Sequence, residues 1–478
     1  MFKKIIGVLL IVVLIAACVF AAISFRPLPE EGEGFTNVLN LPKDTIRLWY
    51  TDESMTDFVN KSSIEYYEET NIRVIPSLKS GLEYIENIYD ASISGAETPD
   101  LYIVGNDSLE KAYLSGVAAD VSNTPSEIDI SMFPTVATNA TTYHDKLVAY
   151  PLYFETCVLV YNKTYIEDLA AKLLASDGEA IDEEEDDDIE VTPDDFTKEE
   201  ISKKVSETIP KTFDEIINLA NNYDAPQTVE SMIKWDVSDV FYNYFFVGNS
   251  INIGGECGDR TDEIDMYNYD LLNSLKVYQL MQQYFYIEID EVDYDAVVND
   301  FIDGKLVFTF ATTDIIEKLN TAKEEGRFNY EFGVAALPDI NDEIKSRGMS
   351  MTGSIAINGY SKNQEIANDF AKFIIEEESD DLYVDAGKIP TYNGVALEDE
   401  SVQIAKLAYE KSIPVPKMIA LSNYWLLLEN CMNRIWALSP IEEEVYALAS
   451  QIMTQVTGEE YNVDRIEFND TTDVEAGD

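Results

Sequence analysis

Hydrophobic and polar residues alternate along this chain in two rhythms. Short apolar runs rich in β-branched and aromatic residues, such as 45–50 and 101–104, predict buried strands. Longer stretches with helical apolar spacing follow them; residues 52–70 are one, with Asp52 or Ser54 placed to cap the start. Alternating strands and helices predict parallel sheets covered by helices. Further strands are expected at 72–75, 306–310, 332–338 and 354–357, and further helices at 82–94, 108–115, 212–217, 271–286, 297–302 and 363–377.

The longest extended run, residues 150–163, carries a carboxylate, Glu155, in its apolar middle. Burying a charge without a partner is costly, so Glu155 is expected to face a cleft rather than a core. A helical pattern follows the run directly, which indicates a chain crossing from one lobe to another. A carboxylate at such a crossing is a candidate ligand-binding group. The alternative is a salt bridge at a hinge.

The N-terminus predicts a membrane attachment. Residues 5–25 carry no charge, and a helix of that length spans a bilayer. The two lysines before them would stay in the cytoplasm. Alternatively, residues 15–18 resemble a lipoprotein cleavage box, with Cys18 as the lipidation site, or the segment serves simple secretion. Each interpretation places the body outside the cytoplasm, at the extracellular face of the membrane, with residues 26–43 as a linker.

The charge restricts the partners. The chain has 90 acidic against 33 basic residues, a formal net charge of -57. Nucleic acid requires a basic footprint and is excluded as a partner. Anionic ligands are disfavoured by the field of the whole protein, so neutral or cationic ligands remain.

The acids include an unbroken run at 182–188, inside a stretch (176–209) that breaks the strand and helix pattern. This stretch is expected to be a solvated surface insertion. Weak, nonspecific cation binding is the alternative, because the run lacks the ordered spacing and glycine of a calcium loop. Helices over 401–460 are expected to be interrupted at its prolines, and residues 463–478 are expected to be a disordered tail.

Cysteine and histidine usage argues against enzyme chemistry. Cys157, Cys257 and Cys431 are the only cysteines of the body, so three free thiols are expected, although one bridge is possible. With a single histidine, His144, and no Cys/His metal spacing, no metal site is expected. No Gly-x-Ser-x-Gly elbow surrounds a serine. Ninety acids make chance carboxylate pairs inevitable, so a glycosidase is not indicated. We expect neither catalysis nor a cofactor.

Several segments fit one family in order and spacing. Together they resemble extracellular solute-binding protein family 1, the carbohydrate-binding, maltose-binding-protein-like components of ABC transporters. The resemblance covers about 44–460. The segments that carry it are 46–52, 99–107, 150–163, 210–215, 304–311, 333–338 and 353–357.

The resemblance implies an α/β fold of the periplasmic-binding-protein type (type II), with two lobes. Each lobe would be a mostly parallel sheet flanked by helices, with a cleft between them. Lobe one would comprise 44–153 plus 354–396, and lobe two 154–353 plus 397–462. A monomer would capture a sugar or oligosaccharide by hinge closure and deliver it to the permease subunits of an ABC importer. A surface sensor or scaffold without transport, and a polyamine- or peptide-binding protein, are the alternatives.

The same resemblance selects ligand-binding candidates. Sugars require charged or amide hydrogen-bonding groups and aromatic rings for stacking. Polar residues after strands could instead cap helices, and aromatic residues could be core. Val104 stands where the family often has Trp, a departure that argues against a maltodextrin-like stacking surface. Thr312 to Asp314 lack the family's aromatic residue, and Asp314 could supply a hydrogen bond in place of stacking. The candidates are Asp52, Glu53, Asn106, Asp107, Glu155, Trp235, Asp236, Asp239, Tyr242, Thr313, Asp314, Gly353, Ser354, Tyr424 and Trp425. Tyr244, Thr312, Lys388 and Tyr392 are further candidates.

Overall fold

The computed structural model describes residues 44–95, 97–122, 128–178, 191–395 and 397–469. The expected anchor, the lipidation site at Cys18 and the acidic run 182–188 lie outside these ranges. Within them, no helix combines the length and apolarity that crossing a membrane requires.

One mixed sheet of ten strands organises the described part of the chain. Its order is β2–β1–β3–β12–β6–β10–β7, with β11 and β13 also paired to β6 and β14 to β12. The first three strands are parallel, and β12 runs antiparallel to both β3 and β6. The strands are β1 Thr45–Tyr50, β2 Arg73–Leu78, β3 Leu101–Gly105, β6 Tyr150–Asn162, β7 Ser231–Ile233, β10 Leu306–Thr312, β11 Phe332–Ala335, β12 Met349–Ile357, β13 Ile389–Pro390 and β14 Ile413–Pro414; two hairpins comprise β4 Thr142–Tyr143 with β5 Lys146–Leu147, and β8 Asn252–Ile253 with β9 Ile264–Asp265.

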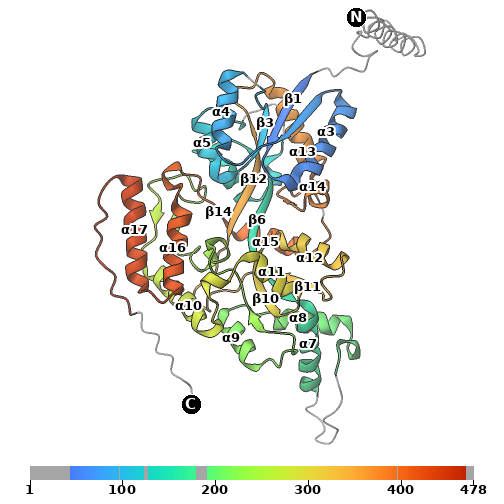
Figure 1. Ribbon diagram of the computed structural model, residues 1–478, viewed down its shortest axis with the longest axis vertical. Helices are drawn as coiled ribbons and strands as arrows, with labels where there is room; N and C mark the ends of the chain where they lie inside the picture. The colour runs from blue at the N-terminus through green and yellow to red at the C-terminus, as the bar shows by residue number, and fades with distance from the viewer. Residues whose placement is uncertain (1–43, 96, 123–127, 179–190, 396, 470–478) are drawn as a thin grey trace, which may run out of the picture.

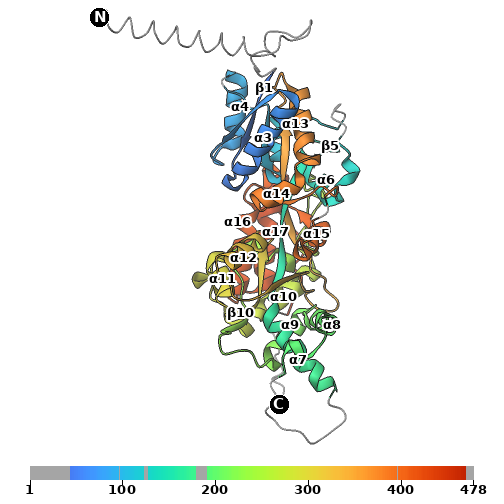
Figure 2. The ribbon, with the colours of Figure 1, turned by 90° about the vertical axis from the view of Figure 1, so that its right-hand side faces the viewer.

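Strand β6 links the two ends of the molecule. Its first half pairs with β12 and β13, and its second half pairs with β10 and β11. In the ribbon, β6 and β12 run along the long axis between an upper part around β1 and β3 and a lower part around β10 (Figure 1). The orthogonal view shows the same elongated shape (Figure 2). The extended run predicted at 150–163 is therefore one continuous strand.

Helices cover both parts of the sheet. In Figure 1, α3, α4, α5, α13 and α14 surround the upper part, while α7 to α12 lie below and α16 and α17 project to one side. The expected interruption of the C-terminal helices at the prolines is confirmed. The helices are α3 Thr56–Thr70, α4 Tyr84–Ser94, α5 Leu109–Leu114, α6 Thr135–Thr141, α7 Lys163–Gly178, α8 Lys198–Thr208, α9 Phe213–Asn222, α10 Tyr269–Phe285, α11 Tyr294–Ile302, α12 Ile315–Glu324, α13 Gln364–Glu376, α14 Ser379–Ala386, α15 Glu400–Lys411, α16 Tyr424–Trp436 and α17 Ile441–Thr457.

Two segments differ from the sequence-based expectations. Helix α8 lies inside the stretch predicted to be an irregular insertion. Thr197 caps it in a reciprocal capping box with Glu200, and Ile201 and Val205 are buried. Residues 463–469 were expected to belong to a disordered tail. The backbone N–H of Ile466, in that segment, donates to the hydroxyl of Tyr267 at 2.7 Å.

The core is continuous through both parts of the sheet. In β6, Phe154 stacks on Tyr409 of α15 at 4.1 Å between ring centroids, while Tyr153 and Glu155 on the opposite face remain partly exposed. This alternation follows from the period of two in a strand. Cys157 and Cys431 are buried and Cys257 is half-buried, and all three are free thiols, as expected.

Candidate functional site

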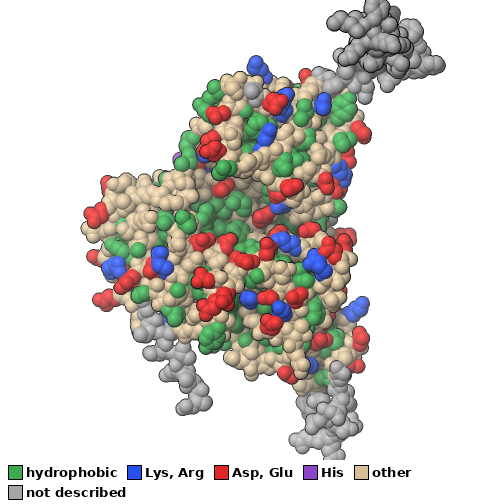
Figure 3. All heavy atoms as spheres, viewed as in Figure 1, with side chains coloured by type: hydrophobic (Ala, Val, Ile, Leu, Met, Phe, Trp, Pro, Cys, Tyr) green, Lys and Arg blue, Asp and Glu red, His purple; other side chains and the backbone are tan. Residues whose placement is uncertain are grey.

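A crevice lies at the carboxyl ends of β1 and β3, the edge where open α/β sheets bind ligands. Thr51 and Asp52 follow β1, and Asp107 follows β3. The crossing strands β6 and β12 continue past this edge toward the lower part of the molecule. Figure 3 shows the hollow between the two parts, with hydrophobic side chains inside it and acidic side chains along its lower rim.

Lys388 joins two of the predicted carboxylates. Its Nζ lies 2.9 Å from Oδ2 of Asp52 and 2.7 Å from Oε1 of Glu155, and its side chain is only 14% exposed. Burial opposes the charge of Lys388, but attraction to Glu155 and the hydrogen bonds to both acids raise its pKa above the usual value. For Asp52, burial likewise opposes ionisation, but Lys388 and Ser54 outweigh it and lower the pKa. The salt bridge that was the alternative to a ligand-binding role for Glu155 is thus present, and it ties the end of β1 to β6.

An aromatic ring lies beside this ion pair. Tyr153 is on the same face of β6 as Glu155, and Nζ of Lys388 is 5.2 Å from its ring centroid, a cation–π contact. The ring covers Gly353 of β12, where a Cβ atom would come within 2.3 Å of it. Gly353 is therefore required for the position of the ring. It also pairs with Gly105 of β3, so two adjacent strands lack side chains at this point.

Asp107 is a carboxylate with a different environment. Its Oδ1 accepts a hydrogen bond from the hydroxyl of Ser108 at 3.3 Å. The surrounding protein raises its pKa by reducing solvation, although the side chain is still accessible to solvent. No ion pair to Asp107 is found among the described residues. Its oxygens are therefore available as hydrogen-bond acceptors.

A cavity of about 310 Å³ opens at the same edge of the sheet. Thr51, Val104, Gly105 and Ser108 line it where β1 and β3 end, and Gly81 contributes from the segment after β2. Lys111 and Glu86, which form an ion pair, lie on its other side. Val104, where the family often has Trp, is one of the residues that line this cavity.

A second group of candidates lies where β10 ends. Asp314 accepts a hydrogen bond from the hydroxyl of Tyr294 at 3.0 Å and pairs with Lys318 at 2.8 Å. The rings of Tyr294 and Tyr242 are stacked, with centroids 4.9 Å apart. The backbone N–H of Thr313 donates to the carbonyl of Thr156 at 3.0 Å, which places this group beside the middle of β6. Asp239 caps the short helix Val240–Tyr242, and loss of solvation raises its pKa.

Asn106 is structural. It is fully buried, its Nδ2 donates to the carbonyl of Val415 and its Oδ1 accepts from the N–H of Thr352, both at 2.8 Å. Because both polar groups are occupied, the prediction that Asn106 contacts a ligand is not supported. It instead clamps the end of β3 to β12 and to the segment after β14.

Several other candidates belong to the core. Trp235 and Tyr424 are completely buried, and Nε1 of Trp235 donates to Asn243 at 2.8 Å. Ser354 is fully buried in β12 with its hydroxyl bonded to Thr352, and Thr313 is 2% exposed. Asp236 is 6% exposed and bonded to Ser238. These side chains are inaccessible to a solute in this conformation. Glu53 is exposed beside Asp52, and Trp425 is half-buried against Tyr244.

Sequence reasoning missed Tyr153 and gave Lys388 little weight. The signal for Tyr153 was readable, because a residue two positions before Glu155 must share its face. The partnership of Glu155 with Lys388 was not readable, because Glu155 and Lys388 are 233 positions apart.

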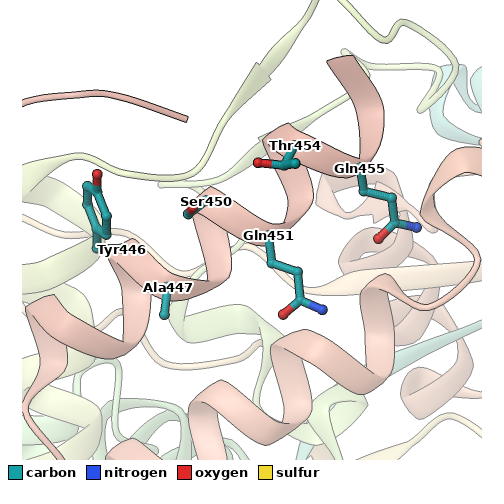
Figure 4. Close-up of a pocket in the computed structure, with 6 residues that line it drawn as sticks. All are labelled: Tyr446, Ala447, Ser450, Gln451, Thr454 and Gln455. Atoms are coloured by element: carbon teal, nitrogen blue, oxygen red, sulfur yellow. The ribbon is translucent and has the colours of Figure 1, made fainter. Parts of the chain in front are cut away.

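A wider hollow of about 610 Å³ lies on α17. It is lined by Tyr446, Ala447, Ser450, Gln451, Thr454 and Gln455, all from this one helix (Figure 4). None of these side chains is charged, and no second element contributes to the lining. The crevice by β1 and β3 is therefore the stronger candidate site.

Comparisons with known proteins agree with this architecture. The sequence pattern of the bacterial extracellular solute-binding proteins matches residues 64–408. A solute-binding protein from Staphylococcus aureus, solved in complex with maltose, is similar with 18% identity and a TM-score of 0.66, over 87% of this chain and 97% of that one. A maltose-binding periplasmic protein from Listeria monocytogenes, also in complex with maltose, has 17% identity and a TM-score of 0.66, over 88% and 100%. These likenesses confirm the predicted fold.

Proposed function

This chain belongs to the bacterial extracellular solute-binding protein family, and we propose that it binds a sugar or oligosaccharide in the crevice beside β1, β3 and β6. The observation that carries the proposal is the juxtaposition of the Tyr153 ring with Asp52, Glu155 and Lys388. A pyranose has an apolar face for the ring and hydroxyl groups for the charged atoms. Two structurally similar proteins in the comparisons were solved in complex with maltose, which supports this ligand class.

The charge balance favours an uncharged ligand over a polyamine. Lys388 already compensates Asp52 and Glu155, and Lys318 compensates Asp314. A polyamine would have to displace these lysines, whereas a polyol needs only the hydrogen-bonding capacity that they leave free. Asp107, which accepts one hydrogen bond from Ser108, is a further acceptor at this edge of the sheet.

Strands β6 and β12 run between the upper and lower parts and would allow the two parts to close on a ligand. We propose that a ligand held by Asp107 and Tyr153 in the upper part also contacts Asp314, whose side chain is 33% exposed, in the lower part. Contacts made to both parts at once stabilise the closed arrangement, by the difference in affinity between closed and open states. The closed protein would then deliver the solute to the permease subunits of an ABC importer.

Attachment to the membrane by residues 5–25, or by a lipid on Cys18, is part of this proposal. Mass spectrometry of the protein from native membranes distinguishes the two. A chain that begins at Met1 supports the anchor, and one that begins at an acylated Cys18 supports lipidation.

Thermal-shift screening against mono- and oligosaccharides tests the ligand class. A ligand at 100 times its Kd should add about 2.7 kcal/mol to the free energy of unfolding. Tyr153→Ala should weaken the binding of any sugar found at least tenfold, or about 1.4 kcal/mol. Tyr161→Ala is the matched control, because its ring covers Gly333 in the same way at the other end of β6. Stabilisation by polyamines and by no saccharide would refute the proposal, and closure without transport would favour a sensor.

A further inference from the structure

Helices α3 and α14 bring three carboxylates together away from the crevice. Glu65 lies on α3, Glu378 immediately precedes α14 and Asp381 is in its first turn. Each offers one oxygen, and these oxygens all lie within 4.8 Å of one another. The two helices pack against each other, and Figure 1 shows both at the right of the upper part, with α14 at its lower end.

Glu378 is the unusual member of this cluster. Only 5% of the residue is exposed, and its Oε2 has no hydrogen-bond partner among the described residues. A buried carboxylate oxygen without a partner is strongly unfavourable, so a native structure is expected to satisfy it. The nearby cation, Lys61, is 2.9 Å from Asp381 and 3.1 Å from Asp385, so it is shared by two other acids.

We propose that Glu65, Glu378 and Asp381 form a binding site for one divalent cation, with calcium as the best-fitting ion. Calcium binds carboxylate oxygens at about 2.3–2.6 Å, so opposite ligands stand about 4.6–5.2 Å apart. This diameter is the upper limit for any two oxygens around one calcium ion, and the three oxygens, all within 4.8 Å of one another, satisfy it. Glu65 and Glu378 have no ion pair with a lysine among the described residues. A divalent ion would compensate their negative charge, and water would complete the coordination.

The competing explanation is a proton shared by Glu65 and Glu378. Loss of solvation, together with the adjacent Glu65, raises the pKa of Glu378 to about 7. Both explanations remove the same excess of negative charge. They differ in whether a metal ion or a proton does so, and therefore in their dependence on calcium.

A cation here would act on the crevice indirectly. Helix α14 ends at Ala386, and Lys388 follows two residues later. Fixing the first turn of α14 to α3 would hold the segment that presents Lys388 to Asp52 and Glu155.

The test measures the Tm of the full-length protein in detergent. The protein is first stripped of metal with EDTA and is then titrated with calcium or magnesium at constant ionic strength and pH 8. Calcium at 100 times its Kd should raise Tm by on the order of 5 °C. Glu378→Gln and, separately, Glu65→Gln should abolish this rise. Asp380→Asn is the matched control, because Asp380 is an exposed acid in the same helical turn outside the cluster, and it should retain the rise.

The outcomes separate the explanations. A calcium effect lost only in the two cluster variants supports the site. An equal effect in all four proteins means diffuse binding to the acidic surface and overturns it. No calcium effect, with Glu378→Gln raising Tm at pH 8, means a shared proton and also overturns it. If Glu378→Gln fails to fold, Glu65→Gln alone decides.

Discussion

Replacing Lys388 with Met should reveal how strongly the crevice depends on its central cation. The substitution keeps most of the volume but leaves Asp52 and Glu155 facing each other without compensation. Breaking a fully buried ion pair costs about 3–5 kcal/mol, and exposed pairs contribute about 0.2–1 kcal/mol. Lys388 is 14% exposed but Asp52 and Glu155 are 36% and 33% exposed, so the pair lies between these limits. We expect a loss of about 2 kcal/mol in the free energy of unfolding at pH 8.

The pH dependence follows from the directions of the pKa shifts. The pKa of Asp52 is lowered on folding, so its contribution is present above the unfolded pKa of about 3.9 and is lost as the pH falls through the folded value. The pKa of Lys388 is raised, so its contribution is present below about 10.4 and is lost as the pH rises through the folded value. The deficit of Lys388→Met should therefore be largest between these limits and should shrink as the pH falls below about 4.

Urea denaturation of both proteins across this pH range measures the effect. Lys203→Met is the control, because Lys203 is 80% exposed and 4.0 Å from Glu207, and it should cost under about 0.5 kcal/mol. If Lys388→Met were as stable as the parent at pH 8, the ion pair would not hold the crevice together.

Three further predictions follow from specific contacts. Gly353→Ala should displace the Tyr153 ring, since the new Cβ would lie 2.3 Å from it. The substitution should lower the free energy of unfolding by about 1–3 kcal/mol and weaken sugar binding in calorimetry. An unchanged affinity would place the ring outside the site. Trp235→Ala should cost about 3–5 kcal/mol in scanning calorimetry and leave the affinity of the folded protein unchanged, because Trp235 is core; a selective loss of affinity would show that it contacts the ligand. In calcium-free buffer, stability should decline as the pH rises from about 4 to about 7, because burial and Glu65 raise the pKa of Glu378 to about 7. Glu378→Gln should flatten this decline in urea midpoints, and an identical pH profile would contradict the raised pKa.

The strands were the most predictable part of this structure, because buried strands have an unmistakable composition and period. The position of Glu155 on an open face of β6 follows from the same period. The helix over Lys198–Thr208 was missed because charged residues outnumber apolar ones there, although the capping box of Thr197 and Glu200 was visible in the sequence.

The candidate site was less predictable, because its contacts are distant in the chain. Polar residues after strands were found, but sequence alone did not distinguish Asp107, which is accessible, from Asn106, which is fully buried. The aromatic residues Trp235 and Tyr424 have the composition of a sugar site and the burial of a core. Only tertiary packing decides between these roles.

The pairing of β6 with β12 contains an irregularity that bears on how the molecule bends. Gly353 pairs with Tyr153 but the next residue, Ser354, pairs with Pro151, so Leu152 is skipped. The carbonyl of Leu152 accepts instead from the N–H of Thr391, at 3.0 Å. Strands β6 and β12 and the segment that begins with Thr391 thus meet at one interrupted rung, where Pro151 also lacks a backbone donor. Rotation of one part against the other can be absorbed there with little loss of backbone hydrogen bonding, and amide exchange should be fastest at this rung.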